Sequence, residues 1–388
     1  MPRSPAIRED RREAFCGLIR RMTRIFLLLV TAALLIFVAC QPASIRIGAF
    51  LSLTGPTSAY GISAANAIKM ALDEASLDQT TSDRFTVEIE DDQSKTEEVP
   101  GIVNHLIKEH EVQALLAEPV STRALAAAPI AQQNQIVMIS SASVKPELTM
   151  QGDYIFRACF VSSTEGDAIA KFARESLKAK TVAIILDPKN DYAVVLANFF
   201  AESFRNRGGS LISQQRYEAN DTDLTAQMNE IKSAAPDVIF APGFYTTAPL
   251  VARAVKRAGI KSTLIGSDGW DSPDLLKNGS DVFEGVYFAN HFWIGSDDPI
   301  TKHFVENYRA RYKVDPDAGA ATAYDAARML FDAFRRAKSH KSADVRDALA
   351  ATRDFPGVTG KITLDQNRNA QVPVYILRIE GGKFTLQH

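Results

Sequence analysis

Short apolar runs alternate with longer segments of helical periodicity from residue 45 to residue 266. The first unit, 45–75, joins an apolar strand, a loop broken at Thr54-Gly55-Pro56, and a helix from about residue 63. Apolar residues fall on both sides of that strand, as in strands buried on both faces of a parallel sheet. Such repeated units fold with right-handed crossovers into doubly wound sheets. The sequence therefore predicts an α/β fold whose ligand loops gather at the carboxyl edges of the strands.

The chain is long enough for two such sheets, because 388 residues exceed what one ordinary core contains. The expected strands of the first sheet are 45–51, 85–90, 112–117 and 135–140, and those of the second are 181–186, 211–217, 237–241, 263–266 and 285–289. Helices are expected near 301–312, 318–338 and 342–350, and strands 361–364 and 373–379 flank the turn DQNRN. The sequence thus predicts two Rossmann-like lobes.

The first 40 residues have the pattern of an export signal. Arg24 precedes the uncharged run 25–39, which is too short for a comfortable transmembrane helix and ends at Cys40. Val38-Ala39-Cys40 resembles the lipobox of bacterial lipoproteins, which implies lipidation of Cys40 and a membrane anchor. An ordinary cleaved signal and an uncleaved anchor are the alternatives, and Met22 is a second candidate start. In each case we expect the body of the chain to be exported, to the periplasm or the cell surface.

The exported chain is expected to be acidic and free of cofactors. Without residues 1–39 it keeps 37 basic and 43 acidic residues, a net charge near −6, which gives no electrostatic basis for nucleic-acid binding. Cys16 leaves with the leader and Cys40 would carry lipid, so Cys159 has no disulfide partner and is interpreted as a core thiol. The six histidines show neither HExxH nor a cysteine–histidine spacing that would hold a metal.

Polar and aromatic side chains mark the loops that follow the expected strands. The first sheet places loops 53–60, 118–122 and 140–145 at one edge. The second contributes Asp187, Tyr192, Phe244, Tyr245 and the run Ser267-Asp268-Gly269-Trp270-Asp271. For Trp270 a pocket wall and hinge packing are equally good interpretations. Glu118 and Arg123, which flank Ser121, are expected to form a solvated or intraprotein ion pair, with direct contact to the ligand as the alternative.

Four segments carry a resemblance to a known family. They are IRIGAFLSLTGPTSAYG, STRALAAAPIAQQNQIVMISSASVKPELT, GSDGWDSPDL and EGVYFANHF. In this order and spacing they are similar to the solute-binding proteins of branched-chain amino-acid ABC transporters, the Leu/Ile/Val-binding type of periplasmic binding protein. The resemblance covers nearly the whole chain from residue 45. It implies two lobes joined by three crossover segments, with the ligand trapped when the lobes close. One lobe would contain 44–162 and 292–367, and the other 163–291 and 368–388.

The resemblance also implies roles for individual residues. Ser121 would hydrogen-bond a ligand carboxylate, together with backbone N–H groups near 142–144. Ala142 would offer its carbonyl to the ligand ammonium, and Asp268 would pair with that ammonium. Val144 stands where the family often has a threonine whose hydroxyl serves the head group of the amino acid. The backbone N–H would remain at this position, but the side-chain oxygen is lost. The expected aromatic wall consists of Tyr60, Tyr192, Phe244 and Tyr245.

Together these features predict an exported, lipid-anchored solute-binding protein without catalytic activity. It would capture a small amino acid, branched-chain-like, or a related amide, and deliver it to the permease of an ABC importer. A sensor or regulator of an amide or amino acid on the same fold is the alternative. A secreted hydrolase is disfavoured because no GxSxG surrounds Ser121. Simple capping of its helix is the other alternative to ligand binding by Ser121.

Overall fold

The structure is a computed structural model that describes residues 44–387, except 79, 81, 82 and 278–280. The predicted signal and the predicted lipidation site Cys40 lie outside these residues. No helix in the described part of the chain combines the length and the apolar character that a membrane span requires.

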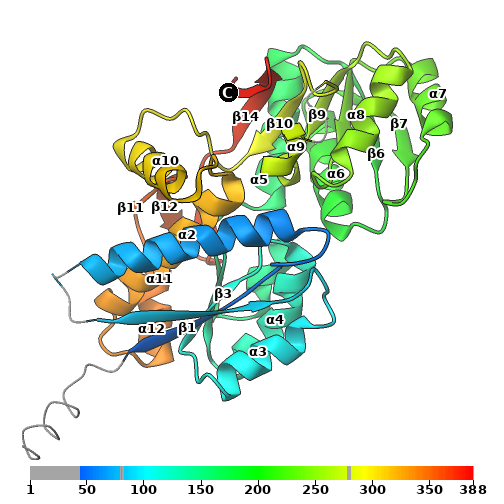
Figure 1. The fold of residues 1–388 in the computed structure, drawn as a ribbon. Helices are drawn as coiled ribbons and strands as arrows, with labels where there is room; N and C mark the ends of the chain where they lie inside the picture. Colours follow the sequence, from blue (N-terminus) through cyan, green and yellow to red (C-terminus); the bar gives the residue numbers. More distant parts are fainter. Residues whose placement is uncertain (1–43, 79, 81–82, 278–280, 388) are drawn as a thin grey trace, which may run out of the picture. The chain divides into compact units, whose positions relative to one another are not determined.

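The first sheet has five parallel strands in the order β2-β1-β3-β4-β5. Two of them, β1 and β3, are labelled in Figure 1. The five strands are β1 (Ile45–Leu51), β2 (Phe85–Asp91), β3 (Ala114–Ala117), β4 (Val137–Ser140) and β5 (Ile155–Arg157). One face packs on α2 (Ser58–Leu77), α10 (Pro299–Tyr312), α11 (Ala318–Arg336) and α12 (Ser342–Ala350), and the other on α3 (Val99–Lys108) and α4 (Ser121–Gln133). Ile47 and Ala49 face the first group while Phe50 faces the second, and all three are buried, as the apolar pattern of this strand predicts. We call this sheet with its helices lobe 1.

The second sheet has seven strands in the order β15-β14-β10-β9-β8-β6-β7, of which only β14 runs antiparallel to its neighbours. They are β6 (Thr181–Leu186), β7 (Ser210–Arg216), β8 (Val238–Ala241), β9 (Thr263–Gly266), β10 (Tyr287–Asn290), β14 (Tyr375–Glu380) and β15 (Lys383–Leu386). One face packs on α5 (Ser162–Lys171), which continues as a π-helical turn (Phe172–Ser176), and on α6 (Asp191–Asn206); the other packs on α7 (Thr225–Ala234), α8 (Ala248–Arg257) and α9 (Pro273–Lys277). We call this sheet with its helices lobe 2.

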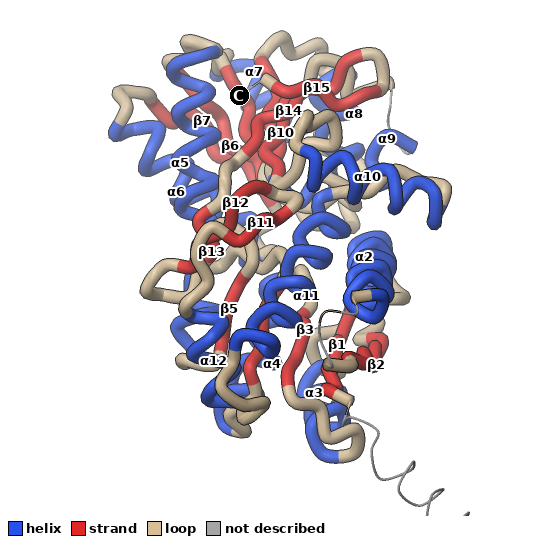
Figure 2. Tube along the Cα trace, turned by 90° about the vertical axis from the view of Figure 1, so that its left-hand side faces the viewer, coloured by secondary structure: helices blue, strands red, loops and turns tan. Residues whose placement is uncertain are grey.

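The chain passes between the lobes three times. It leaves lobe 1 after β5, returns after β10, and enters the second sheet again at β14. Between the last two crossings it forms α10 to α12 and a small sheet of β11 (Phe355–Gly357), β12 (Gly360–Leu364) and β13 (Ala370–Gln371). This small sheet lies beside the end of β5 in Figure 2. Arg157 of β5 and Asn369 form a β-bridge there. These crossings confirm the predicted fold class. The lobe boundaries predicted at 162, 291 and 367 stay a prediction.

Two local expectations were wrong. Helix α2 begins at Ser58 rather than near residue 63, so Tyr60 lies in its first turn and not in a loop. Its early start follows from Gly61, whose missing side chain lets this turn pack against the backbone of Ser52. The turn DQNRN joins β12 to β13, whereas the segment expected to follow it as the partner strand belongs to the second sheet as β14. Long-range pairing with β10 decides this, and local turn chemistry cannot reveal it.

Candidate functional site

A small cavity of about 50 Å³ lies between the carboxyl edges of the two sheets. It contains seven of the eight residues predicted as ligand contacts, and Tyr245 is the exception. Its walls are Tyr60, Pro119, Val120, Ser121, Ala142, Val144, Ala318 and Gly319 from lobe 1, and Tyr192, Phe244, Asp268, Gly269, Asp271 and His291 from lobe 2. Both lobes are therefore needed to form it.

The lobe 1 side centres on Ser121, the first residue of α4. The Ser121 side chain is buried, and its Oγ accepts a long hydrogen bond of 3.4 Å from the N–H of Lys145. Because the first N–H groups of a helix have no partner within the helix and carry a partial positive charge, this end of the cavity favours a negative group.

The loop that carries Ala142 and Val144 is held in place by a buried arginine. Arg157 donates to the carbonyls of Ser143 (2.9 Å) and Lys145 (2.6 Å). The carbonyl of Val144 accepts from both the N–H (2.9 Å) and the hydroxyl (3.1 Å) of Ser162 at the start of α5. This loop is therefore rigidly placed beside the cavity, and its apolar Val144 side chain is buried.

The lobe 2 side centres on Asp268, which follows β9 and begins a short 3₁₀ turn (Asp268–Trp270). One carboxylate oxygen lies 2.8 Å from Nε2 of His291, and the other accepts the hydroxyl of Tyr192. The N–H of Asp268 donates to Glu165 at 2.9 Å. Two side chains thus fix the carboxylate at the cavity wall, and a third holds the backbone of Asp268.

His291 is not among the predicted contacts, although it belongs to the segment EGVYFANHF that carries the family resemblance. It lies directly after β10, where the rule that ligand loops follow strands could have identified it. Its ring stacks on Phe160, with centroids 3.8 Å apart, and the side chain is buried. Nε2 meets Asp268, whereas Nδ1 is buried without a hydrogen-bond partner.

Buried acids surround this side of the cavity. Burial and the nearby charge of Asp268 raise the pKa of Glu165 well above its usual value. Burial also raises the pKa of Asp271, which accepts from Asn290 and from the N–H of Ala318, each at 2.8 Å. Burial and the charge of Asp271 raise the pKa of Asp317 to about 7. The surroundings of Asp268 therefore favour a positive group on the ligand.

Aromatic side chains close the cavity where the lobes meet. Tyr192 stacks on Phe244 at 5.2 Å, and Tyr60 meets the edge of Phe244 at 6.1 Å. The hydroxyl of Tyr60 donates across the lobes to the carbonyl of Gly269. Tyr245 packs edge-on against Tyr60 at 4.8 Å, and its hydroxyl donates to the carbonyl of Pro56 at 3.0 Å. Tyr245 therefore buttresses Tyr60 from behind and does not line the cavity.

This two-lobed arrangement agrees with the comparison to known families. Residues 44–383 match the family model described as periplasmic binding protein. The chain belongs to the periplasmic binding protein family.

Individual relatives share most of the chain. The Leu/Ile/Val-binding protein BraC3 of Rhizobium johnstonii is 26% identical over 91% of this chain and 97% of its own. The solved structure of a leucine-binding protein, LivK, from Thermotoga maritima has a TM-score of 0.84 and 31% identity, covering 89% of this chain and 98% of that one. The branched-chain amino-acid transporter substrate-binding protein LivJ from Streptococcus pneumoniae, in complex with isoleucine, has a TM-score of 0.82 and 29% identity, covering 88% and 98%.

Several conspicuous residues of this periplasmic binding protein have structural roles outside the cavity. Glu118 and Arg123 form the predicted ion pair, buried and 2.5 Å apart; burial raises the pKa of Glu118 to about 7 against the opposing effect of Arg123. Trp270 is buried and packs against Phe283, with ring centroids 5.7 Å apart, so it is core rather than pocket wall. Cys159 is the predicted core thiol, and burial raises its pKa to about 12.

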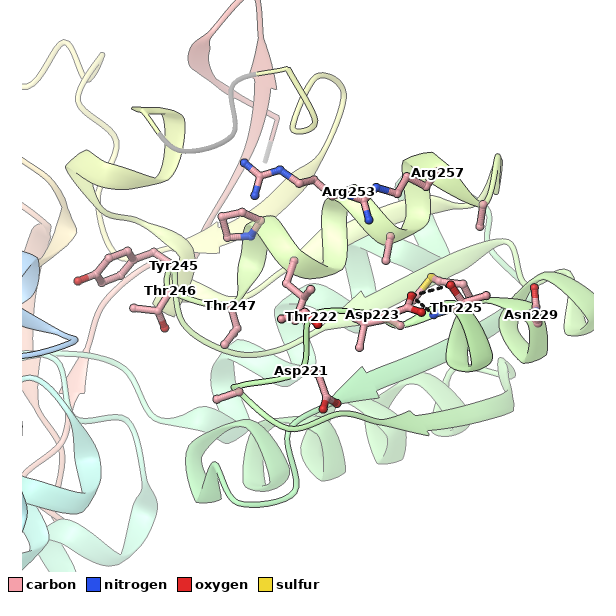
Figure 3. A pocket seen from close by; sticks show the side chains of 17 residues that line it. Asp221, Thr222, Asp223, Thr225, Asn229, Tyr245, Thr246, Thr247, Arg253 and Arg257 are labelled. Atoms are coloured by element: carbon pink, nitrogen blue, oxygen red, sulfur yellow. Dashed lines mark hydrogen bonds between the residues drawn. The ribbon is translucent and has the colours of Figure 1, made fainter.

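A larger groove of about 860 Å³ lies on lobe 2, between α7, α8 and the loop before α7 (Figure 3). Its acidic residues serve local turns: Asp223 accepts from the N–H (3.0 Å) and hydroxyl (2.6 Å) of Thr225, and Asp221 accepts from the N–H of Glu218 (2.9 Å). All its walls come from one lobe of the binding protein, so lobe closure would not enclose a ligand there. The interlobe cavity is therefore the candidate ligand site.

Proposed function

We propose that this protein captures a small amino acid, or a related amide, by closing its two lobes around it. The observation that carries the proposal is the opposite polarity of the two ends of the cavity. Ser121 and the amino end of α4 suit a carboxylate, while Asp268 and its acidic surroundings suit an ammonium. A zwitterion with both groups would match both ends at once.

Apolar side chains between the two ends would receive the ligand side chain. Val120, Val144 and Phe244 line the cavity together with the rings of Tyr60 and Tyr192. The relatives named for leucine, isoleucine and valine support a branched-chain amino acid as the ligand class.

His291 would compensate for the oxygen that is lost at Val144. A buried ligand group without its hydrogen-bond partner costs about 1 to 3 kcal/mol. The unpartnered Nδ1 of His291 offers a polar contact at the same cavity. The tautomer of His291 decides whether Nδ1 donates or accepts a hydrogen bond. Because Nε2 contacts the Asp268 carboxylate, which accepts, the proton is favoured on Nε2, and Nδ1 is then an acceptor.

The side chains of a hydrolytic triad share this cavity, but their contacts support binding rather than catalysis. His291 uses Nε2 on Asp268, as a triad histidine would, yet the one hydrogen bond found for Ser121 Oγ among the described residues comes from the N–H of Lys145. A nucleophilic serine instead donates to its histidine base. The ligand should therefore be recovered unchanged after incubation, which mass spectrometry checks.

Delivery to an ABC permease and anchoring through Cys40 complete the proposal. Family membership implies export to the periplasm. The permease follows from LivJ, which is named as the substrate-binding protein of a branched-chain amino-acid transporter, and the anchor follows from the lipobox resemblance.

A thermal-shift screen of the purified protein against amino acids and amides tests the proposal. A ligand that binds only the folded protein raises the melting temperature by mass action. We expect stabilisation by small apolar amino acids, confirmed by calorimetry. The Ser121→Ala variant should lose most of this shift. An unshifted melting temperature across the whole set would contradict the proposal.

A further inference from the structure

Glu90, His105 and His110 gather on lobe 1, outside the ligand cavity. Oε1 of Glu90 lies 2.8 Å from Nδ1 of His105, and the rings of His105 and His110 meet edge-to-face with centroids 4.8 Å apart. One possible ligand atom from each residue lies within 4.8 Å of the other two. Among the residues that the structure describes, no other three His, Cys, Asp or Glu side chains come together in this way.

The backbone brings these residues together from three places. Glu90 lies near the end of the edge strand β2, paired in register with Phe50 of β1. His105 lies in the last turn of α3, and its carbonyl accepts from the N–H groups of Glu109 (2.9 Å) and His110 (3.4 Å), which folds the chain back. Glu111 completes this turn with a φ of 48°. Four residues separate the histidines, which fits the H-x₃₋₅-H half of a zinc-finger pattern. No cysteine pair accompanies them, and Glu90 comes 15 residues before His105, so the sequence alone predicted no metal site.

Two imidazoles and one carboxylate are ligands that suit a borderline metal ion. Zn²⁺ binds histidine nitrogen and carboxylate oxygen, and three protein ligands leave one position for water. Ca²⁺ and Mg²⁺ prefer sets of oxygen ligands, so this set discriminates against them. Zinc is therefore the natural probe for this cluster.

The geometry is close to that of a bound site. Tetrahedral ligand atoms at bonds of about 2.1 Å lie about 3.4 Å apart, so ligand atoms within 4.8 Å of one another must approach by up to about 1.4 Å. His105 can make this adjustment because half of its side chain is exposed (51%), whereas the Glu90 side chain is 22% exposed and more firmly held. The alternative to a metal site is a surface ion pair between His105 and Glu90, which would contribute little to the stability of the protein.

We propose that Glu90, His105 and His110 bind one Zn²⁺, with the fourth coordination position open to water. The site is independent of the amino-acid cavity, because none of its residues lines that cavity. Metal binding requires neutral imidazoles, so the affinity should fall on acidification.

Calorimetric titration of ZnCl₂ into the purified protein, without amino-acid ligand, tests the proposal. We expect one saturable equivalent, and at least a tenfold weaker affinity in each of His105→Gln, His110→Gln and Glu90→Gln. His303→Gln is the matched control, since His303 lies on α10 beside Asn307 and outside the cluster; it should bind zinc like the wild type.

Two results would overturn the proposal. One is the absence of saturable zinc binding by the wild type. The other is an unchanged affinity in all three variants, which would place any bound zinc elsewhere in the chain. Melting curves recorded without metal establish that each variant is folded, so a lost equivalent reports on the site itself.

Discussion

His291 Nε2 lies 2.8 Å from Oδ2 of Asp268, and both side chains are almost completely buried (3% and 8% exposed). His291 holds one oxygen of this carboxylate, while Tyr192 holds the other. A carboxylate held by two neighbours loses little further freedom when it meets a ligand, so this pair preorganises the lobe 2 end of the cavity.

Replacing Asp268 by asparagine should lower the affinity for an amino-acid ligand by more than tenfold. The change keeps the size of the side chain but removes the charge that would pair with the ammonium. Calorimetry with the best ligand of the thermal-shift screen measures the effect. Asp221→Asn makes the same charge change in the groove of lobe 2 and should leave affinity unaltered. An unchanged dissociation constant for Asp268→Asn would remove Asp268 from the site.

The Tyr60→Phe variant should release its ligand about two- to tenfold faster. It loses the hydroxyl that donates across the lobes to the Gly269 carbonyl, a contact worth about 0.5 to 1.5 kcal/mol in the closed state. Stopped-flow fluorescence measures the dissociation rate. Tyr312→Phe is the control, because that hydroxyl bonds to the Asn66 carbonyl (2.7 Å) within lobe 1. Equal rates for Tyr60→Phe and wild type would argue against a role in closure.

Asp317 should make the protein less stable as the pH rises towards neutrality. Its pKa is raised to about 7 by burial and by Asp271, so the folded chain keeps a proton that the unfolded chain has lost. The stabilising contribution of this proton to the free energy of unfolding is fully present below the unfolded pKa of about 4 and is lost by about pH 7. Between these values the free energy of unfolding should fall by up to about 1.4 kcal/mol per pH unit. Urea unfolding at several pH values should show a flatter profile for Asp317→Asn.

Asparagine is the appropriate substitution because Asp317 also caps α11, and asparagine can keep that cap while removing the titrating carboxyl. Oδ1 of Asp317 accepts from the N–H of Ala320 at 2.8 Å, and an asparagine oxygen can take over that bond. Asp315→Asn, on an exposed residue paired with Arg309, should keep the wild-type profile. A wild-type slope in Asp317→Asn would show that other groups cause the pH dependence.

The sequence predicted most of the fold because each strand and helix carries its own periodicity. β6 and β9 have the expected bounds, and the buried pattern of β1 follows directly from its apolar residues. The three crossings between lobes came from the resemblance alone, because no local signal shows that the chain after β13 joins the second sheet. The start of α2 was misplaced because it depends on contact between Gly61 and Ser52.

The candidate site was predictable where its residues lie in loops with a recognisable pattern. Tyr60, Ser121 and Asp268 share one cavity as expected, although their contact with a ligand stays a prediction. His291 was not predicted because its place in the site depends on its contact with Asp268, which is 23 residues away in the sequence. Likewise, Asp271 gains its position from the N–H of Ala318, 47 residues along the chain. Pairings of this kind exist only in the folded chain.

Two glycines in helices should respond in opposite ways to alanine. A Cβ on Gly61 in α2 would lie 2.0 Å from the carbonyl oxygen of Ser52, which is backbone at the end of β1 and cannot turn aside. Gly61→Ala should therefore lower the free energy of unfolding by more than about 2 kcal/mol. Gly101 in α3 has no neighbour within 4 Å, so Gly101→Ala should raise that free energy by about 0.5 to 1 kcal/mol through the better helix propensity of alanine. Urea denaturation of both variants measures the pair. A Gly61→Ala protein as stable as the wild type would mean that α2 does not approach Ser52 this closely, and the position of Tyr60, one residue earlier on the same turn, would then need to be redrawn.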